Sequence, residues 1–171
     1  MIRSVAAIAA MCLVSTACGY HTAGHANLLP SDLRTIAVPA FVNQTQTYKI
    51  EQTLTSSVVH EFTTRTKYRI TSDPSSSDAT LRGTVLSTYT TPLTYDTQTG
   101  RAATVLVIVS MKVSLTDHEG REIYQNPSYV FRDQYQISQD LSSFFEEDSP
   151  AFQRLSRDFA RTLVSNILEA F

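Results

Sequence analysis

The sequence predicts an α+β domain, a two-layer sandwich in which two helices pack on one face of a mixed, largely antiparallel sheet of four to five strands. Two segments, 49–65 and 149–171, repeat apolar residues every three or four positions, as one-sided helices do. Between them, residues 81–137 alternate apolar and polar side chains, which is typical of half-buried strands. Helices with one apolar face need a sheet to cover, so these observations favour a single two-layer domain.

The chain begins with features of an export signal. Arg3 is followed by an apolar run over 5–14 and by the small residues of 15–17. The run is too short for a membrane of ~30 Å, which requires ~20 helical residues, so residues 1–17 are predicted to be a cleaved signal peptide. Ala17 suits a lipoprotein signal, although Ser15 stands where Leu is usual. The mature chain would begin at Cys18.

Cys18 is the one cysteine that would remain after cleavage, because Cys12 leaves with the leader. An exported protein with one unpaired cysteine requires an explanation, and acylation of Cys18 supplies it, since two or more acyl chains anchor a protein stably. The alternative is an ordinary secretory signal that leaves a free thiol. We therefore expect covalent lipid at Cys18 and no other cofactor.

Composition limits the remaining options. The mature chain has about 150 residues, enough for one domain with a core of its own. The full chain has 14 basic and 16 acidic residues, and Arg3 leaves with the leader, so no basic surface for nucleic acid is expected. We predict three parts, namely the signal peptide, a tether over 18–32 containing Gly24 and Pro30, and one domain over 33–171.

The first half of the domain reads as strand, helix, strand. Residues 33–41 (LRTIAVPAF) form a short apolar run interrupted by Pro39, residues 49–65 carry the helical spacing, and residues 68–71 are rich in strand formers. The loop 72–78 follows. A crossover of this kind is right-handed and places its two strands parallel.

The second half reads as an antiparallel meander closed by a helix. The first of its strands, around 81–95, is expected to place Leu81, Val85, Tyr89, Leu93 and Tyr95 on one side, with Arg82, Thr84, Thr88 and Thr90 on the other. Turns at 96–100 and 117–120 separate it from strands at 103–115 and 129–137. Ser149 and Pro150 are a typical helix start, and an apolar stripe follows to the C-terminus.

Three short phrases carry a resemblance to a known family: CGYH at 18–21 with Gly24, IAVPAF at 36–41 followed by NQT at 43–45, and DATLRG at 78–83. In these phrases and in element order the chain resembles the LPS-assembly lipoprotein family, LptE. The resemblance implies an outer-membrane lipoprotein facing the periplasm. It further implies that the partner is the LptD β-barrel, which members occupy and help to fold, and that the chain assists delivery of lipopolysaccharide to the cell surface.

One strand has an apolar pair where polar residues are expected. Leu106 and Ile108 lie opposite Val105, Val107 and Val109, so they should be exposed on the face without helices. One reading is a docking contact with a barrel wall or an acyl chain. The alternative is that a loop or the tether covers them.

A phosphorylated glycolipid would need cations. Arg82 and Lys112 lie on the polar faces of two expected neighbouring strands, and Arg101 adjoins the turn between them. These three are candidate lipopolysaccharide contacts, and the alternative is that they are ordinary solvated charges.

No pattern for catalysis or metal binding is present in the sequence. It has no Gly-x-Ser-x-Gly elbow, Walker loop or dinucleotide fingerprint, so the chain is expected not to be an enzyme. His21 and His25 lack a third ligand, and the acidic run 146–148 suits the start of a helix. An accessory lipoprotein of another envelope transport or secretion system is the alternative function.

Overall fold

The structure is a computed structural model that describes residue 29 and residues 33–137 and 150–169. The expected signal peptide, Cys18, most of the tether and the acidic run 146–148 lie outside the described residues. The elements in chain order are β1 (Thr35–Ala37), β2 (Val42–Asn43), α2 (Ile50–Arg65), β3 (Arg69–Thr71), the 3-10 turn η1 (Pro74–Ser76), β4 (Ala79–Tyr95), β5 (Ala102–Asp117), β6 (Glu122–Gln136) and α3 (Pro150–Glu169).

The described strands form one six-stranded mixed sheet in the order β3-β1-β4-β5-β6, with β2 paired to β4 beside β1. β1 and β3 are parallel and are joined through α2, which confirms the predicted crossover. The sequence-based strand count was too low, and the description of the sheet as largely antiparallel was wrong. Of the five strand pairings, three are parallel, namely β1 with β3, β1 with β4 and β2 with β4.

Pro39 is the physical reason for the extra strand. Of the predicted strand 33–41 only Thr35–Ala37 is strand, as β1, and the unpredicted β2 begins beyond it at Val42. Proline has no N–H to donate to a neighbouring strand. The two short pieces pair separately along β4, β1 at Ala79 and Thr80 and β2 at Thr84 and Val85.

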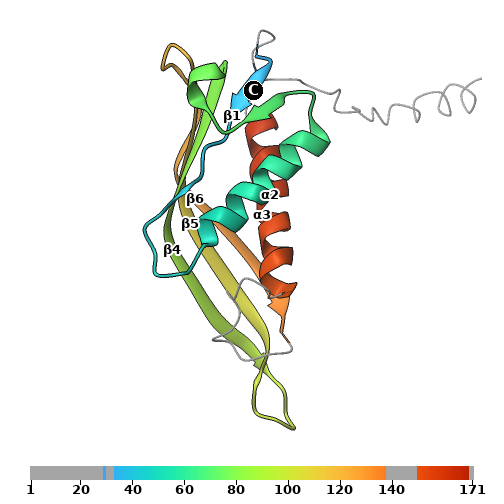
Figure 1. The fold of residues 1–171 in the computed structure, drawn as a ribbon. Helices are drawn as coiled ribbons and strands as arrows, with labels where there is room; N and C mark the ends of the chain where they lie inside the picture. Colours follow the sequence, from blue (N-terminus) through green and yellow to red (C-terminus); the bar gives the residue numbers. More distant parts are fainter. Residues whose placement is uncertain (1–28, 30–32, 138–149, 170–171) are drawn as a thin grey trace, which may run out of the picture.

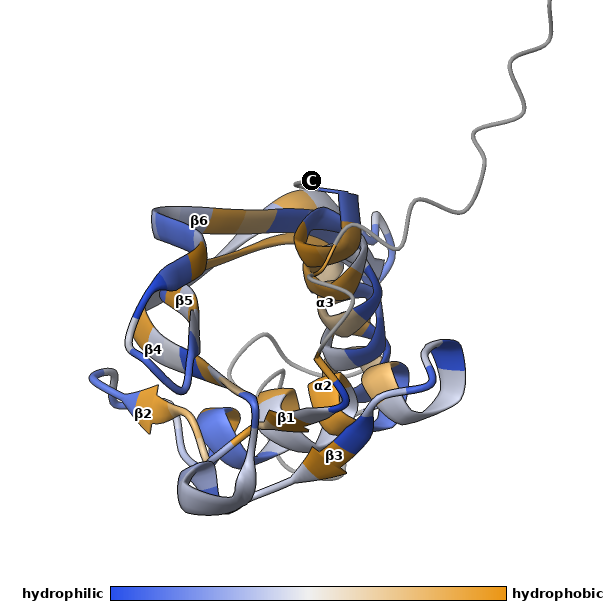
Figure 2. Ribbon diagram, turned by 90° about the horizontal axis from the view of Figure 1, so that it is seen from above, coloured by the Kyte–Doolittle hydropathy of each residue, from blue (hydrophilic) through white to orange (hydrophobic). Residues whose placement is uncertain are grey.

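The predicted two-layer arrangement is present. Both helices lie on the same side of the sheet, and the sheet curves around them (Figures 1 and 2). Each helix buries one stripe, as its spacing predicts. The fully buried large side chains of the helices include Ile50, Leu54, Phe62, Phe152, Leu155, Phe159, Leu163 and Ile167.

Phe159 of α3 occupies the centre of this helix–sheet contact. Its ring meets Tyr129 of β6 edge-on, at a centroid distance of 5.9 Å, and Phe131 at 5.8 Å. All three side chains are buried. Edge-to-face aromatic contacts add to the stabilisation that burial of the rings already provides.

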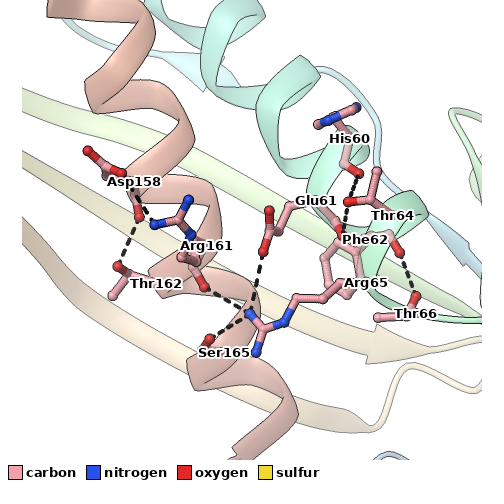
Figure 3. Close-up of polar contacts among 10 residues, drawn as sticks. All are labelled: His60, Glu61, Phe62, Thr64, Arg65, Thr66, Asp158, Arg161, Thr162 and Ser165. Atoms are coloured by element: carbon pink, nitrogen blue, oxygen red, sulfur yellow. Dashed lines mark hydrogen bonds and ion pairs between the residues drawn. The ribbon is translucent and has the colours of Figure 1, made fainter.

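Away from the sheet, a polar contact joins the two helices (Figure 3). Arg65, in the last turn of α2, donates from Nη1 to Ser165 Oγ of α3 at 2.7 Å and approaches Glu61 Oε1 at 3.4 Å. The guanidinium also reaches the carbonyl oxygen of Arg161 at 3.5 Å. Because these groups are partly exposed, they fix how the helices align more than they add to stability.

A bulge in β4 changes which residues face the helices. The register with β5 shifts between Val85 and Ser87, so the alternation reverses beyond that point. Leu81 and Val85 are fully buried, but Tyr89, Leu93 and Tyr95 are exposed. The prediction that all five share one face was therefore wrong. Thr88 and Thr90, expected on the polar side, pair instead with the buried Val109 and Val107.

Asp78 connects β4 to the start of β1. Its Oδ2 accepts the main-chain N–H groups of Arg34 at 2.9 Å and Thr35 at 2.8 Å. These two bonds hold the pKa of the Asp78 carboxyl below its ordinary value, with the nearby His118 and Arg34 charges adding to the effect. The first residue of the DATLRG phrase therefore has a structural role in the parallel part of the sheet.

We expect acid to weaken this connection. Because the pKa of Asp78 is lower folded than unfolded, the unfolded chain takes up the proton first as pH falls below about 4, and the stability gained from the carboxylate is lost. Asp78→Asn should lower the free energy of unfolding by about 1 kcal/mol at pH 7, after allowance for solvent screening. Urea unfolding between pH 7 and pH 3 should show the variant and the parent chain converging at acid pH. A difference in the free energy of unfolding that stays constant from pH 7 to pH 3 would contradict this role of Asp78.

Candidate interaction surface

The face of β4, β5 and β6 turned away from the helices, here called the outer face, holds the residues of interest. Ile108 of β5 pairs with Tyr89 of β4 on one side and with Arg132 of β6 on the other. Side chains of directly paired residues point to the same face of a sheet. Tyr89 and Arg132 therefore flank Ile108 on the outer face.

The neighbouring rows of the outer face are arranged in the same way. Leu106 is flanked by Thr91 and Gln134, and Ser110 is flanked by Ser87 and Val130. Tyr89 is 60% exposed and Val130 is 40% exposed, while Leu106 and Ile108 are partly buried between their neighbours. We call Tyr89, Leu106, Ile108 and Val130 the outer apolar band.

Leu106 and Ile108 lie on the outer face as expected, but half-buried and not exposed, and the outer apolar band is wider than the two residues expected from the sequence. Tyr89 joins it because of the β4 bulge, and Val130 joins it from β6. Exposed apolar residues that are contiguous across three strands mark an interaction site more often than scattered ones do. The sequence alone could not place Tyr89 and Val130 beside Leu106 and Ile108, because their positions depend on the register of the strands.

Arg82 and Lys112 lie on the outer face toward the opposite end of these strands. Arg82 pairs with Ser114, and Lys112 pairs with Thr84, so the two cations are diagonal neighbours with Cβ atoms ~7–8 Å apart. Both side chains are exposed. Within the described residues, neither forms a hydrogen bond or ion pair. They are close enough to contact one phosphate group together.

Arg101 is not part of that pair. It adjoins the β4–β5 turn, where its carbonyl oxygen accepts the Asp96 N–H at 2.8 Å. The turn lies at the other end of the hairpin, 13 residues of β4 away from Arg82, which corresponds to roughly 40 Å. The expected cluster of three cations is therefore a pair and one distant residue.

A hollow of about 540 Å³ lies where β6 ends, lined by Gln134, Tyr135, Gln136, Ile137 and Arg154. Burial of Tyr135 raises the pKa of its hydroxyl well above the ordinary value, and Asp133 Oδ2 lies 3.5 Å from that oxygen. Nothing in the described lining provides a catalytic constellation.

The described chain lacks two further features. Its residues include no group of three His, Cys, Asp or Glu side chains placed to hold a metal ion. Neither described helix has both the length and the apolar character needed to span a membrane. The prominent feature of the described surface is thus the outer face, apolar toward one end and basic toward the other.

The described residues thus form an α+β domain with two helices on one face of a mixed sheet and a band of apolar side chains on the opposite face. A family model described as LptE, lipopolysaccharide-assembly, matches residues 33–167, which is most of the chain. The chain belongs to the LptE family. No curated protein sequence matches it significantly.

Two solved structures share the fold. The hypothetical protein CT253 from Chlamydia trachomatis is 11% identical, with a TM-score of 0.52, and the alignment covers 81% of this chain and 99% of that one. A PelC dodecamer from Paraburkholderia phytofirmans is 13% identical, with a TM-score of 0.51, and the alignment covers 80% of this chain and 89% of that one. At these identities the likeness is one of fold alone.

Proposed function

We propose that this chain is an outer-membrane lipoprotein that associates with an LptD-like β-barrel, supports its assembly and assists delivery of lipopolysaccharide to the outer leaflet. Membership of the LptE family supports a role in lipopolysaccharide assembly. Acylation of Cys18 after removal of residues 1–17 would hold the domain at the periplasmic side of the outer membrane. The chain would act by binding and not by catalysis.

The outer apolar band is the observation that carries the proposal. Both helices of the domain lie on the other side of the sheet, so Tyr89, Leu106, Ile108 and Val130 are left without a covering layer among the described elements. A barrel wall is itself a sheet, and two sheets can pack face to face. We therefore place the barrel contact on the outer face.

The exposed cations suit the second part of the role. Arg82 and Lys112 can meet one phosphate between them, because charge-assisted bonds to phosphate oxygens are among the stronger polar contacts. Arg101 would contact lipopolysaccharide separately, at the hairpin end, since it lies far from this pair. Apolar residues elsewhere on the outer face would suit the acyl chains of the same molecule.

The test is recovery of the barrel with the full-length chain. The double variant Leu106→Glu/Ile108→Glu would place two carboxylates in the contact, so we expect barrel recovery from detergent-solubilised outer membranes to fall at least about tenfold. Circular dichroism and thermal unfolding should show that the isolated domain still folds, because both positions face away from the core.

The matched control adds the same charge elsewhere. Gln52→Glu/Ser56→Glu lies on the exposed side of α2 and should recover the barrel as the parent chain does. If Leu106→Glu/Ile108→Glu recovers as much barrel as the parent chain does, the outer face is not the docking site. Recovery of an inner-membrane ATPase complex in place of a barrel would favour an accessory role in another envelope system.

A further inference from the structure

The outer edge of β6 has main-chain groups that no described strand engages. β6 is the last strand of the sheet and pairs only with β5. Ile137 donates its N–H to the carbonyl oxygen of Ala103 at 3.0 Å, and the register runs unbroken from there to Tyr129. Antiparallel strands direct alternate residues toward the partner strand. The N–H groups of Val130, Arg132 and Gln134 therefore point away from β5.

Side chains close this edge on both sides of a short window. The Gln134 N–H donates to Asp133 Oδ1 at 2.7 Å, and the Ser128 N–H donates to Asn126 Oδ1 at 3.1 Å. Beyond Gln134, the carbonyl oxygen of Gln136 accepts a bond from Arg154 Nη2 at 3.2 Å. Such capping blocks unwanted strand pairing. Between the capped N–H groups of Ser128 and Gln134, the outward N–H groups of Val130 and Arg132 have no acceptor among the described residues.

We propose that this window receives one extended strand of the protein partner, paired by main-chain hydrogen bonds with Val130 and Arg132. Strand addition to an exposed edge is a common way to bind an extended segment. The window adjoins the outer apolar band, since Val130 belongs to both, so one partner can cover the two together. The inference rests on the proposed function, because the barrel is its stated partner.

Charge indicates what the incoming strand carries. Arg132 is exposed on the outer face and forms no ion pair within the part of the chain that the structure describes. A carboxylate on the added strand, directly opposite Arg132, would complement it. A second copy of this chain fits less well, because two β6 edges would bring two Arg132 side chains together across the seam.

Proline tests the window without disturbing β5, because Val130 directs its N–H away from that strand. Val130→Pro removes the outward donor of residue 130, whereas Val130→Ala keeps it. Val130→Ala also shortens an apolar side chain of the outer apolar band, so it serves as the reference, and barrel recovery with the full-length chain should be about tenfold lower for Val130→Pro than for Val130→Ala. Gln134→Pro is the matched control, since Asp133 already occupies that N–H, and it should bind normally.

Equal recovery with Val130→Pro and Val130→Ala would overturn the proposal, as would a purified chain that dimerises through this edge and loses the dimer in Val130→Pro. Arg132→Glu should weaken barrel recovery more than Arg132→Gln does, and the reverse order would exclude an acidic strand.

If Val130→Pro does not fold, hydrogen exchange of the backbone amides in the parent chain, with and without the barrel, tests the same contact. Exchange at Val130 and Arg132 should slow at least about tenfold in the complex, and unchanged exchange would refute strand addition. A parent chain that recovers no barrel would count against the proposed function itself.

Discussion

Phe159→Ala is expected to lower the free energy of unfolding by about 3–5 kcal/mol, the range for deletion of a fully buried Phe side chain. Phe159 is 0% exposed and supports Tyr129 and Phe131 edge-on, so its removal empties the space where α3 meets β6. A loss of this size is a large part of the ~5–15 kcal/mol by which domains are stable. Urea unfolding followed by circular dichroism measures it.

The control for this variant lies on the same helix. Arg161→Ala removes an exposed side chain whose partner, Asp158, is 3.8 Å away on the surface, and stability should change by no more than about 0.5 kcal/mol. A loss below about 1 kcal/mol for Phe159→Ala would show that the helix–sheet contact is looser than the structure describes.

Gly83→Ala has the second largest expected effect. A Cβ atom at this position of β4 would lie 2.8 Å from Phe41 Cδ1 and 2.9 Å from Cγ of the same ring. Phe41 is 3% exposed, so the ring has little space into which it can move. We expect the free energy of unfolding to fall by about 1–3 kcal/mol, as is usual for an overpacked core.

A second substitution should relieve the clash, because the cause is a single contact. Phe41→Leu shortens the side chain that meets the new methyl group, so the double variant Gly83→Ala/Phe41→Leu should be more stable than the sum of the single effects predicts. Urea unfolding of the four chains gives this coupling energy. If the stability change of the double variant equals the sum of the single changes within about 0.5 kcal/mol, the cost of Gly83→Ala does not come from the contact with Phe41.

The periodic parts of the sequence predicted the fold well. Residues 49–65 are helical as α2 from Ile50, and the stripe after Pro150 is α3. The parallel relation of β1 and β3 follows from their order around α2. What local spacing could not reveal was the division at Pro39 into two strands and the bulge after Val85, because both depend on how β4 pairs with its neighbours.

The same limit applies to the interaction surface. Leu106 and Ile108 were identifiable because they depart from alternation within one strand. Tyr89 was placed on the wrong face, since one unpaired residue reverses the alternation beyond it. Val130 and Arg132 could be set beside Ser110 and Ile108 only once the register was known.

The phrases behind the family resemblance describe the framework of the domain. Asp78 and Gly83 from the third phrase contact Arg34, Thr35 and Phe41. Asn43, after the second phrase, accepts the N–H of Thr45 and donates to the carbonyl oxygen of Thr47, which shapes the loop before α2. In the described chain these phrases therefore determine how β1, β2 and β4 pack together. The residues of the outer face lie outside the phrases, with the exception of Arg82.

The topology of β4 has a consequence for the order of folding. Its pairing with β5 joins residues close in sequence through a short turn, and so does the pairing of β5 with β6. Its pairing with β1 joins Ile36 to Ala79, which requires closure of a much longer loop containing α2. Local hairpins close faster than distant parallel pairs do. We therefore expect the stretch nearest the proposed membrane anchor to pair last, and a chain acylated at Cys18, as proposed, would be tethered at the bilayer before its sheet is complete.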